Sequence, residues 1–388
     1  MNADELLLRA VSDVVPRELA EKKLASGSPM RIYLGIDPTG AKLHLGHSVP
    51  LRKLKAFQDA GHHVIFLIGS FTAMIGDPSG REKEREPLTK EQVMKNFETY
   101  REQAGKILDF TKVEVRPNHE WLEKLGFREI LSLARQFTVQ QMIERDMFER
   151  RLVQGNPIGV HEFLYPLMVG YDSVALDVDC ELGGSDQYFN MLAGRTLQKA
   201  FGKRDKFVLT TKLIEGTDGR KMSKTYDNCI WIEDTAQEMY GKILSIKDEL
   251  IVPYMECVTG MPMKDVKEAA EAMAKGDNPK DWKMKLAREV VTLYHDRDAA
   301  KAAEEEFDNV FAKKGVPDDV EMATVEKGSL LVDVMVKHGL VPSKGEARRL
   351  IGQKGVHLNE KIVEAVDAKV EEGLLKVGKR RFLKIAIV

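Results

Sequence analysis

Two short motifs constrain this chain more than any other feature: His44-Leu45-Gly46-His47 and, far downstream, Lys221-Met222-Ser223-Lys224-Thr225. The first motif follows a predicted buried strand, Arg31–Ile36, and a turn at Asp37-Pro38-Thr39-Gly40, and it opens a predicted helix over residues 46–60. A helix N-terminus presents free backbone N–H groups and the positive end of the helix dipole. The order strand, turn, helix therefore predicts an α/β unit that binds a phosphate group.

The side chains of both motifs suit a triphosphate. His44 and His47 lie three residues apart and can face one anion from the first helical turn, while Gly46 lets a nucleotide approach the backbone. Lys221 and Lys224 follow a flexible polar stretch, and they can close over the phosphates and neutralise a leaving pyrophosphate. Either motif alone is weak, because paired histidines are more often a cap and a surface residue, and lysine-rich loops are usually just solvated. Together and in this order, the motifs predict the activation of an amino acid by ATP.

Strands and helices alternate over residues 30–225, which is the pattern of an α/β fold. Residues 64–68 and 174–178 are predicted strands, and residues 186–201 a predicted helix. Such alternation builds a mostly parallel sheet covered by helices, with ligands at the carboxyl ends of its strands. Residues 128–152 are strongly amphipathic, a pattern that an ordinary packed helix explains by itself.

The chain after residue 228 divides into three predicted parts. Residues 229–312 are helical throughout, with long helices over 262–280 and 282–311, and residues 313–327 are a linker. Residues 328–388 form a compact tail, in which Ser343 caps a helix over 343–353 and Glu346 completes a capping box. The other predicted tail elements are a helix over 330–338 and strands over 356–359 and 381–385.

Charge is distributed unevenly between the tail and the rest of the chain. Residues 328–388 hold 12 Lys and Arg against seven Asp and Glu, whereas the remainder holds 47 against 54. The cysteines, Cys180, Cys229 and Cys257, have neither metal-type spacing nor an even number, which predicts no zinc and no disulfide. The acidic N-terminus leads into an amphipathic helix, and no apolar run approaches membrane-spanning length, so we expect a cytoplasmic protein with no membrane partner.

Further motifs accompany the two phosphate motifs. They are Tyr33-Leu34-Gly35-Ile36-Asp37-Pro38-Thr39, Gly76-Asp77-Pro78-Ser79-Gly80, Tyr171-Asp172 and Gly183-Gly184-Ser185-Asp186-Gln187. On these residues the chain resembles, over essentially its whole length, the class I aminoacyl-tRNA synthetases, specifically the bacterial-type tyrosyl-tRNA synthetase family. The resemblance implies a Rossmann-like parallel-sheet catalytic domain over 1–228, an α-helical anticodon-side domain over 229–312 and a small α+β RNA-binding domain of αL type over 328–388.

The same resemblance implies a role for individual residues. Residues that act on the phosphates and in catalysis are His44, His47, Lys221, Lys224 and Thr39. Residues that bind tyrosine are Tyr33, Thr72, Asp77, Tyr165, Asp172 and Gln187. Residues that bind ATP are Gly35, Asp37, Gly46, Gly184, Asp186, Met222 and Ser223. Residues of the tail that bind RNA are Lys344, Arg348, Arg349 and Lys354, with Lys379, Arg380 and Arg381 following.

The tyrosine pocket has one predicted departure from the family. Tyr33 and Asp172 are expected at its floor, where a phenol needs both a donor and an acceptor and where phenylalanine would leave both groups unpaired. Tyr171-Asp172 follows an apolar segment, which favours burial over a surface turn. Four residues after Tyr165, however, stands Val169, where the family usually has a glutamine that holds the substrate amine and carboxylate. Valine makes no such bonds, which puts strict specificity for tyrosine in question.

The expected reaction has two steps and no side-chain nucleophile. The tyrosine carboxylate attacks the α-phosphorus of ATP, and the terminal ribose of tRNA(Tyr) then attacks the adenylate, with Mg²⁺ held mainly by ATP oxygens and no protein-ligated metal. The resemblance also implies a homodimer whose interface residues 128–152 help to form, although their spacing alone fits an ordinary packed helix about as well. A tryptophanyl-type enzyme would share both phosphate motifs but lack the basic tail, and a noncatalytic RNA-binding paralogue would have lost motif residues. The intact motifs argue against the paralogue.

Overall fold

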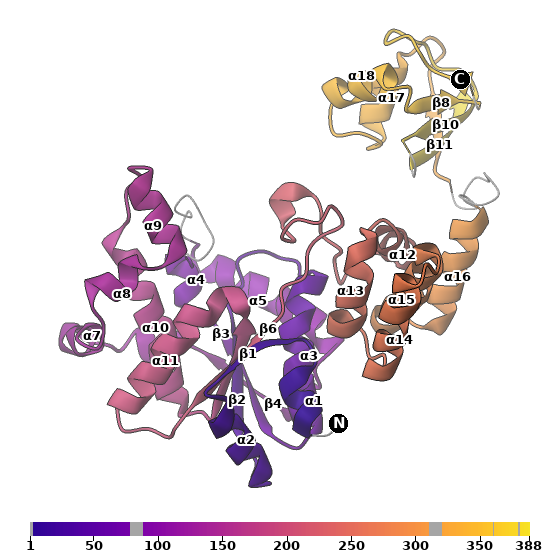
Figure 1. Ribbon diagram of the computed structural model, residues 1–388. Coiled ribbons are helices and arrows are strands. Elements are labelled where there is room, and N and C mark those ends of the chain that lie inside the picture. Colours follow the sequence, from indigo (N-terminus) through magenta and orange to yellow (C-terminus); the bar gives the residue numbers. More distant parts are fainter. Residues whose placement is uncertain (1–2, 78–87, 310–319, 360, 379–380) are drawn as a thin grey trace. The chain divides into compact units, whose positions relative to one another are not determined.

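The computed structural model describes residues 3–77, 88–309, 320–359, 361–378 and 381–388 (Figure 1). The chain forms two compact units, residues 1–300 and 301–388. None of the helices within these ranges is long and apolar enough to cross a membrane.

A six-stranded sheet is the centre of the first unit (Figure 1). Its strands are β1 (Val11–Val15), β2 (Arg31–Ile36), β3 (His63–Ile68), β4 (Val113–Pro117), β5 (Cys180–Gly184) and β6 (Phe207–Thr211). They lie in the order β1-β6-β5-β2-β3-β4, with every pair parallel except β1 with β6. The chain leaves β2 toward β3 on one side and returns to β5 on the other, so the connections diverge at the carboxyl ends of β2 and β5. The predicted α/β fold with a mostly parallel sheet is confirmed.

Helices pack on this sheet through their apolar faces. Those of the sheet unit are α1 (Ala3–Leu8), α2 (Arg17–Ala25), α3 (Leu45–Asp59), α4 (Thr72–Ile75), α5 (Lys90–Gly105), α6 (His119–Leu122), α7 (Phe127–Ala134), α8 (Val139–Ile143), α9 (Asp146–Val153), α10 (Val160–Leu176) and α11 (Tyr188–Ala200). α3 contacts β2, β3 and β5, and α11 contacts β5 and β6. The predicted helices over 46–60 and 186–201 are confirmed as α3 and α11, the latter preceded by a short 3-10 turn, Ser185–Gln187.

One predicted strand is wrong. Residues 174–178 belong mostly to α10, which ends at Leu176, and Asp177 adopts the left-handed conformation with φ 48°. The strand itself begins at Cys180. A run of valine and leucine suits a buried helix as well as a buried strand. Here the close packing of α10 on α11 favours the helix. A Cβ at Gly170 of α10 would lie 3.1 Å from the backbone of α11.

The region after β6 is helical, as predicted, but its helices are shorter. They are α12 (Ala236–Leu244), α13 (Ile251–Val258), α14 (Met263–Ala274), α15 (Pro279–Tyr294) and α16 (Arg297–Phe307). The predicted helix over 262–280 ends early because Asn278 caps a new helix with Pro279 at its first position. The predicted helix over 282–311 is divided at His295, whose φ of −122° and ψ of −112° are not helical. Residues 310–312 lie outside the described residues.

The tail packs two helices on a five-stranded sheet. Its elements are β7 (Met322–Val325), α17 (Leu331–Lys337), α18 (Lys344–Gly352), β8 (Val356–Leu358), β9 (Lys361–Ile362), β10 (Gly373–Val377) and β11 (Arg381–Ile387). The strand order is β7-β11-β10-β8-β9, with β7 parallel to β11. The N-cap at Ser343 is confirmed, because its hydroxyl accepts the Glu346 N–H at 3.2 Å, but the Glu346 carboxylate pairs with Arg349 instead of closing the box.

The predicted linker over 313–327 is wrong at its end. β7 lies inside that range and belongs to the tail sheet, with Ala323 and Val325 buried in the tail core. Buried and exposed residues alternate over only the four residues of β7, and such a short pattern is hard to distinguish from a polar connection. Residues 313–319 lie outside the described residues.

Candidate active site

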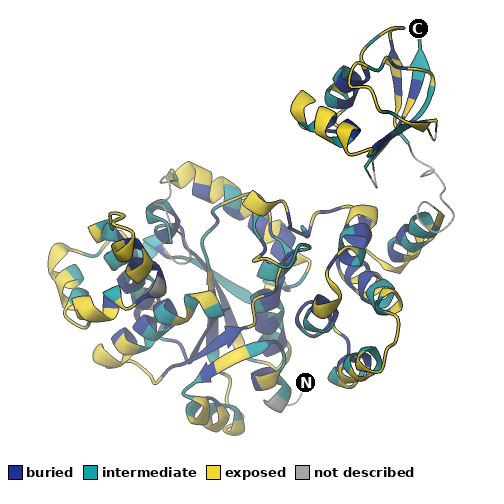
Figure 2. Ribbon diagram, turned by 45° about the horizontal axis from the view of Figure 1, so that its top comes forward, coloured by how far each residue is buried: buried dark blue, intermediate teal, exposed yellow. Residues whose placement is uncertain are grey.

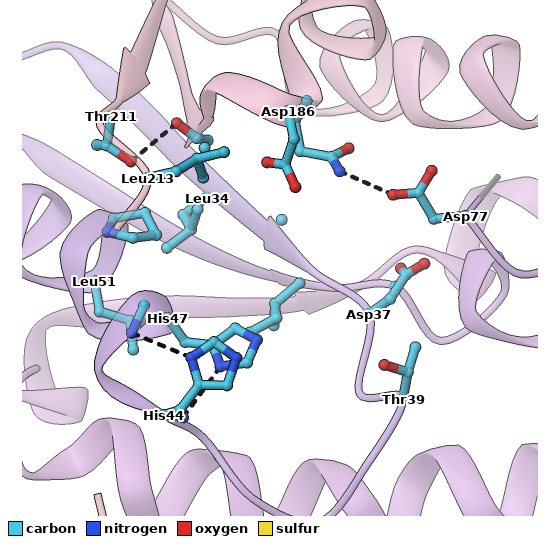
Figure 3. Close-up of a pocket in the computed structure, with 18 of the residues that line it drawn as sticks. Leu34, Asp37, Thr39, His44, His47, Leu51, Asp77, Asp186, Thr211 and Leu213 are labelled. Atoms are coloured by element: carbon cyan, nitrogen blue, oxygen red, sulfur yellow. Dashed lines mark hydrogen bonds between the residues drawn. The ribbon is translucent and has the colours of Figure 1, made fainter. Parts of the chain in front are cut away.

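The carboxyl ends of the central strands and the N-terminus of α3 border a cavity of about 1320 Å³ (Figure 3). Every residue predicted for catalysis, for tyrosine and for ATP lines this cavity. In the sequence these residues extend from Tyr33 to Lys224. Val169 lines it too. Within the described ranges, no three His, Cys, Asp or Glu side chains gather as a metal site. Of the glycine-rich motif at 76–80, residues 78–80 lie outside the described residues.

The two histidines cap α3 reciprocally. His44 Nδ1 accepts the Gly46 N–H at 3.1 Å, and His47 Nδ1 accepts the His44 N–H at 3.2 Å. The rings lie 3.8 Å apart between centroids, and Figure 3 shows them side by side in the cavity. Because each Nδ1 is an acceptor, each neutral ring carries its proton on Nε2.

Both histidines are neutral near neutral pH. Burial lowers the pKa of His44 to about 2, aided by His47 and Lys221. Burial also lowers the pKa of His47 to about 4, opposed by Asp186 and aided by Lys221. The pair therefore presents two Nε2–H donors and no positive charge, and lysines such as Lys221 and Lys224 supply cationic groups that line the cavity.

The lysine motif is held by one buried amide that the sequence analysis did not identify. Asn228 is 2% exposed; its Oδ1 accepts the Ser223 N–H at 2.8 Å, and its Nδ2 donates to Asp218 Oδ1 at 2.8 Å and to the Lys221 carbonyl at 3.2 Å. The stretch over 216–220, predicted to be flexible, is thus a hydrogen-bonded turn. Lys221 Nζ lies 2.9 Å from Asp186 Oδ2.

Carboxylates and hydroxyls gather at the predicted ammonium end of the cavity. Asp37 accepts from the Tyr165 hydroxyl at 2.8 Å and from the Thr72 hydroxyl at 2.7 Å. Gln187 Nε2 donates to Asp77 Oδ2 at 2.8 Å. Burial raises the pKa of Tyr165 well above its usual value, and Asp37 and Asp77 raise it further. This concentration of negative charge suits a positively charged amine.

A second layer supports Gln187. Asn190 Nδ2 donates to Gln187 Oε1 at 2.8 Å, and Arg145 Nη2 lies 3.4 Å from Asn190 Oδ1. Arg145 is buried between the rings of Phe148 and Phe189. Burial lowers the pKa of Arg145 to about 10, opposed by Asp77. Asn190 and Arg145 were missed because they meet across 45 residues of sequence.

Asp172 is buried, as its position after an apolar segment predicted. Its side chain is 2% exposed; Oδ1 accepts the Trp121 Nε1–H at 2.7 Å, and Oδ2 accepts from Asn118 Nδ2 at 3.2 Å. Burial raises its pKa well above the usual value, and the bonds from Trp121 and Asn118 oppose that rise. Asn118 directly follows the carboxyl end of β4, where ligand-binding residues are common, so its position was the available signal.

The four predicted RNA-binding residues lie on α18 and the turn after it. Lys344 pairs with Asp333 at 2.7 Å, Arg349 with Glu346 at 2.6 Å and Lys354 with Glu364 at 3.3 Å. Arg348 is exposed and forms no ion pair within the part of the tail that the structure describes. Exposed pairs of this kind are weak, so a phosphate can replace the carboxylates. Of the three basic residues predicted beside them, Lys379 and Arg380 lie outside the described residues.

Comparison with known proteins agrees with this geometry. The family described as tRNA synthetases class I (W and Y) matches residues 25–312, and the Tyrosine--tRNA ligase SYY-like C-terminal domain matches residues 308–382. The chain therefore belongs to the class I tRNA synthetases, which are ATP-dependent enzymes.

Its relatives narrow the class. Tyrosine--tRNA ligase of Thermotoga maritima is 46% identical over 387 residues, covering 98% of this chain and 96% of the relative. The Carboxydothermus hydrogenoformans enzyme of the same name is 47% identical over 397 residues, covering 98% and 97%. Within the class, the chain belongs to the bacterial tyrosine–tRNA ligase family.

Solved structures agree on the fold. A C-terminally truncated mitochondrial tyrosyl-tRNA synthetase of Aspergillus nidulans superposes with a TM-score of 0.66 at 25% identity, covering 79% of this chain and 92% of that one. Plasmodium falciparum tryptophanyl-tRNA synthetase shares the fold with a TM-score of 0.56 at 15% identity, covering 74% and 80%. The tryptophanyl alternative is not favoured, because the high-identity relatives are tyrosine ligases.

Proposed function

We propose that this chain activates L-tyrosine with ATP to form tyrosyl-adenylate and then transfers the tyrosyl group to the 3′ end of tRNA(Tyr). The observation that supports these roles is the single cavity, in which phosphate donors, an acidic amine site and a buried carboxylate line one continuous space. In-line attack by the tyrosine carboxylate needs positioning and charge stabilisation rather than a protein nucleophile.

At the phosphate end, the neutral histidines and the charged lysines have different roles. The Nε2–H groups of His44 and His47 donate to the phosphate oxygens, while Lys221 and Lys224 neutralise the charge that develops on pyrophosphate. ATP enters as its magnesium complex, with the metal held by phosphate oxygens and water. Asp186 accepts from the ribose hydroxyls, so Lys221 exchanges its ion pair with Asp186 for a phosphate when ATP binds. Gly46 and Gly184 leave room for the nucleotide.

At the amino-acid end, Asp77, Tyr165 and Thr72 bind the ammonium group, and Gln187 lies beside the adenylate. Asp172 accepts the phenol proton and Tyr33 supplies the donor. Because Trp121 and Asn118 already bind both oxygens of Asp172, this carboxylate is fixed in direction before tyrosine arrives.

Pyrophosphate exchange measured with each amino acid tests this function, and Asp172→Asn sharpens the test. The amide keeps the shape but turns one acceptor into a donor that faces Trp121 or Asn118. We expect the specificity constant for tyrosine to fall by about 100-fold and the ratio of tyrosine to phenylalanine to fall with it. An unchanged ratio would place Asp172 outside the site. Exchange that is absent with every amino acid would leave only an RNA-binding role.

Val169 gives a separate prediction about the amine site. It lines the cavity one helical turn after Tyr165, within reach of the same ligand group. Val169→Gln is expected to raise the specificity constant for tyrosine about 10-fold, the effect of one or two bonds to a charged group. Val169→Leu, which adds bulk without a polar atom, is the control. If glutamine brings no gain, or the parent prefers a modified tyrosine, the pocket is built around another side chain.

The chain is also proposed to act as a homodimer through the helices over 128–152 and their neighbours. Phe127 on α7 is 76% exposed, Val153 on α9 is 83% exposed and Val160 on α10 is 77% exposed. Figure 2 shows exposed residues along these helices. Large exposed apolar side chains gathered on adjoining helices suit an interface between copies.

Sedimentation measures this assembly. Val153→Glu is expected to shift the chain from dimer to monomer, because it buries a charge in an apolar contact. Val366→Glu makes the same substitution at an exposed valine of the tail, and it should leave the sedimenting mass at that of the dimer. A wild-type monomer, or a Val153→Glu dimer, would remove this interface.

We propose a catalytic domain over 1–228, an anticodon-side helical domain over 229–312 and an RNA-binding tail that includes β7. The tail residues Lys344, Arg348, Arg349 and Lys354 contact tRNA phosphates, which gives salt-sensitive affinity with little sequence information. A cytoplasmic location is proposed because the substrates ATP and tRNA are found there.

A further inference from the structure

A second set of buried polar side chains lies against Tyr33. It consists of Ser173 on α10, Glu181 on β5 and Lys206 directly before β6, and these are 0%, 4% and 2% exposed. Burying a lysine and a glutamate costs free energy even when they pair, and an apolar pair of the same size is often no less stable. Stability alone therefore does not explain why the Ser173–Glu181–Lys206 cluster is buried at this position.

The cluster is connected directly to the hydroxyl of Tyr33. Lys206 Nζ donates to Ser173 Oγ at 2.6 Å and forms an ion pair with Glu181 Oε2. Ser173 Oγ lies 3.3 Å from Glu181 Oε2 and 3.0 Å from the Tyr33 hydroxyl. Lys206 Nζ also lies over the Tyr33 ring, 5.7 Å from its centroid. Glu181 lines the same cavity as Tyr33 and Asp172.

The packing around the cluster leaves it little freedom. A Cβ at Gly194 of α11 would lie 2.5 Å from both Lys206 Nζ and Ser173 Oγ, and 3.1 Å from Glu181 Oε2. Only a glycine lets α11 approach this closely. Ser173 also directly follows Asp172 on α10, so one helical segment holds both the acceptor for a phenol and the partner of Tyr33.

The direction in which Ser173 donates its hydroxyl proton decides whether Tyr33 can donate a hydrogen bond into the cavity. Lys206 donates to Ser173, so the Ser173 hydroxyl keeps one proton to give, either to Glu181 or to Tyr33. When Ser173 gives it to Glu181, Tyr33 gives its own proton to Ser173. When Ser173 gives it to Tyr33, the Tyr33 proton is available to the cavity. A phenol that donates to Asp172 needs a donor for its oxygen, which only the second arrangement supplies.

We propose that Lys206, acting through Ser173 and Glu181, positions the Tyr33 hydroxyl as the hydrogen-bond donor to the phenol oxygen of the substrate. Lys206, Glu181 and Ser173 are then positioning residues that help the site to select tyrosine over phenylalanine. This inference rests on the proposed roles of Tyr33 and Asp172. With phenylalanine bound, Ser173 donates to Glu181 and Tyr33 donates to Ser173, so the substrate receives no hydrogen bond from Tyr33.

Two variants test the inference. Ser173→Ala removes the hydroxyl that links Lys206 to Tyr33, and Lys206→Met with Glu181→Gln removes the ion pair without leaving a buried charge. In pyrophosphate exchange, both are expected to raise the KM for tyrosine about 10-fold and to lower the tyrosine-to-phenylalanine ratio about 10-fold, the effect of one lost hydrogen bond in a buried site. The kcat and the KM for ATP should not change. Equilibrium tyrosine binding without ATP should weaken by the same factor.

The matched control is another buried lysine. Lys53 is 4% exposed and donates to the Leu6 carbonyl at 3.0 Å, and it does not line the cavity. Lys53→Met should lower the Tm and leave the discrimination ratio unchanged. A ratio that falls equally in Lys53→Met would mean that loss of stability alone explains the effect, and would overturn the inference.

Tyr33→Phe, measured in parallel, separates this inference from the proposed function. If Tyr33→Phe lowers the ratio and the cluster variants do not, the positioning role is wrong while the role of Tyr33 stands. If Tyr33→Phe leaves the ratio unchanged, the assigned role of Tyr33 fails, and the inference fails with it. Should the double variant not fold, Ser173→Ala decides, because it deletes a single oxygen.

Discussion

Replacing His47 or Lys224 by alanine is expected to slow tyrosyl-adenylate formation by about 100- to 1000-fold while tyrosine binding changes little. Both side chains line the cavity and are assigned to the phosphates, and on that assignment they act on charge that is present chiefly in the transition state. Pre-steady-state adenylate formation, measured beside equilibrium tyrosine binding, checks this expectation. Equal losses in the two measurements would remove the assigned role.

The geometry of the histidine pair supplies controls for His47. Its Nδ1 accepts the His44 N–H, so alanine also removes a cap of α3. Glutamine places an N–H donor near the former Nε2 and should retain more activity than asparagine, which places its amide near the former Nδ1. Lys224 is exposed and forms no ion pair within the described part of the chain, so Lys224→Ala should leave the Tm unchanged. A large drop in Tm for that variant would point to a structural role.

The neutral state of the histidines bears on the pH dependence. Their pKa values are lowered to about 2 and about 4, so both stay uncharged as the pH falls from neutral toward 5. An unfolded chain takes up protons on these groups below its ordinary histidine pKa, whereas the folded chain does not. Stability that the pair contributes is therefore present at neutral pH and is lost as the pH falls.

The phosphate site could be predicted because its signals are local. The strand, the turn and the capped helix around His44 lie within about thirty consecutive residues, and each is set by short-range chemistry. The other predicted site residues came from the resemblance to the synthetase family, and all of them line the same cavity. Asn118 and Trp121 were not found, because their partner Asp172 is more than fifty residues away in the sequence. The partners of Asn228 lie within ten residues, but in a loop that no helix or strand pattern marks.

The wrong strand over 174–178 and the missed strand β7 have the same origin. Residues 174–178 have the composition of a strand, but the fit of Gly170 against α11 keeps residues 174–176 in a helix. β7 was missed because its pairing partner, β11, follows it by more than fifty residues. Glu181 and Lys206 appear in the sequence as isolated charges, and only the sheet places them beside Ser173. Long-range pairing of buried polar groups is the part of the site that no single-sequence pattern encodes.

Removing residues 320–388 is expected to leave pyrophosphate exchange nearly intact and to weaken tRNA binding by about 100-fold at low salt. Every residue assigned to ATP and tyrosine precedes residue 226, whereas the basic residues of α18 lie in the second unit. The cut must precede β7, because a cut near Lys327 would leave one strand of the tail sheet behind and expose its apolar face.

A salt series makes the tail experiment quantitative. If Lys344, Arg348, Arg349 and Lys354 each contact a phosphate, the slope of log affinity against log salt should fall by about 3 in the truncated chain. Arg348→Ala alone should lower it by about 1, because each lost phosphate contact removes about one released counterion. Lys337→Ala changes an exposed lysine of the neighbouring helix α17 and serves as the control, with no expected change. A folded, truncated chain that charges tRNA with unchanged affinity and slope would show that the tail does not bind RNA.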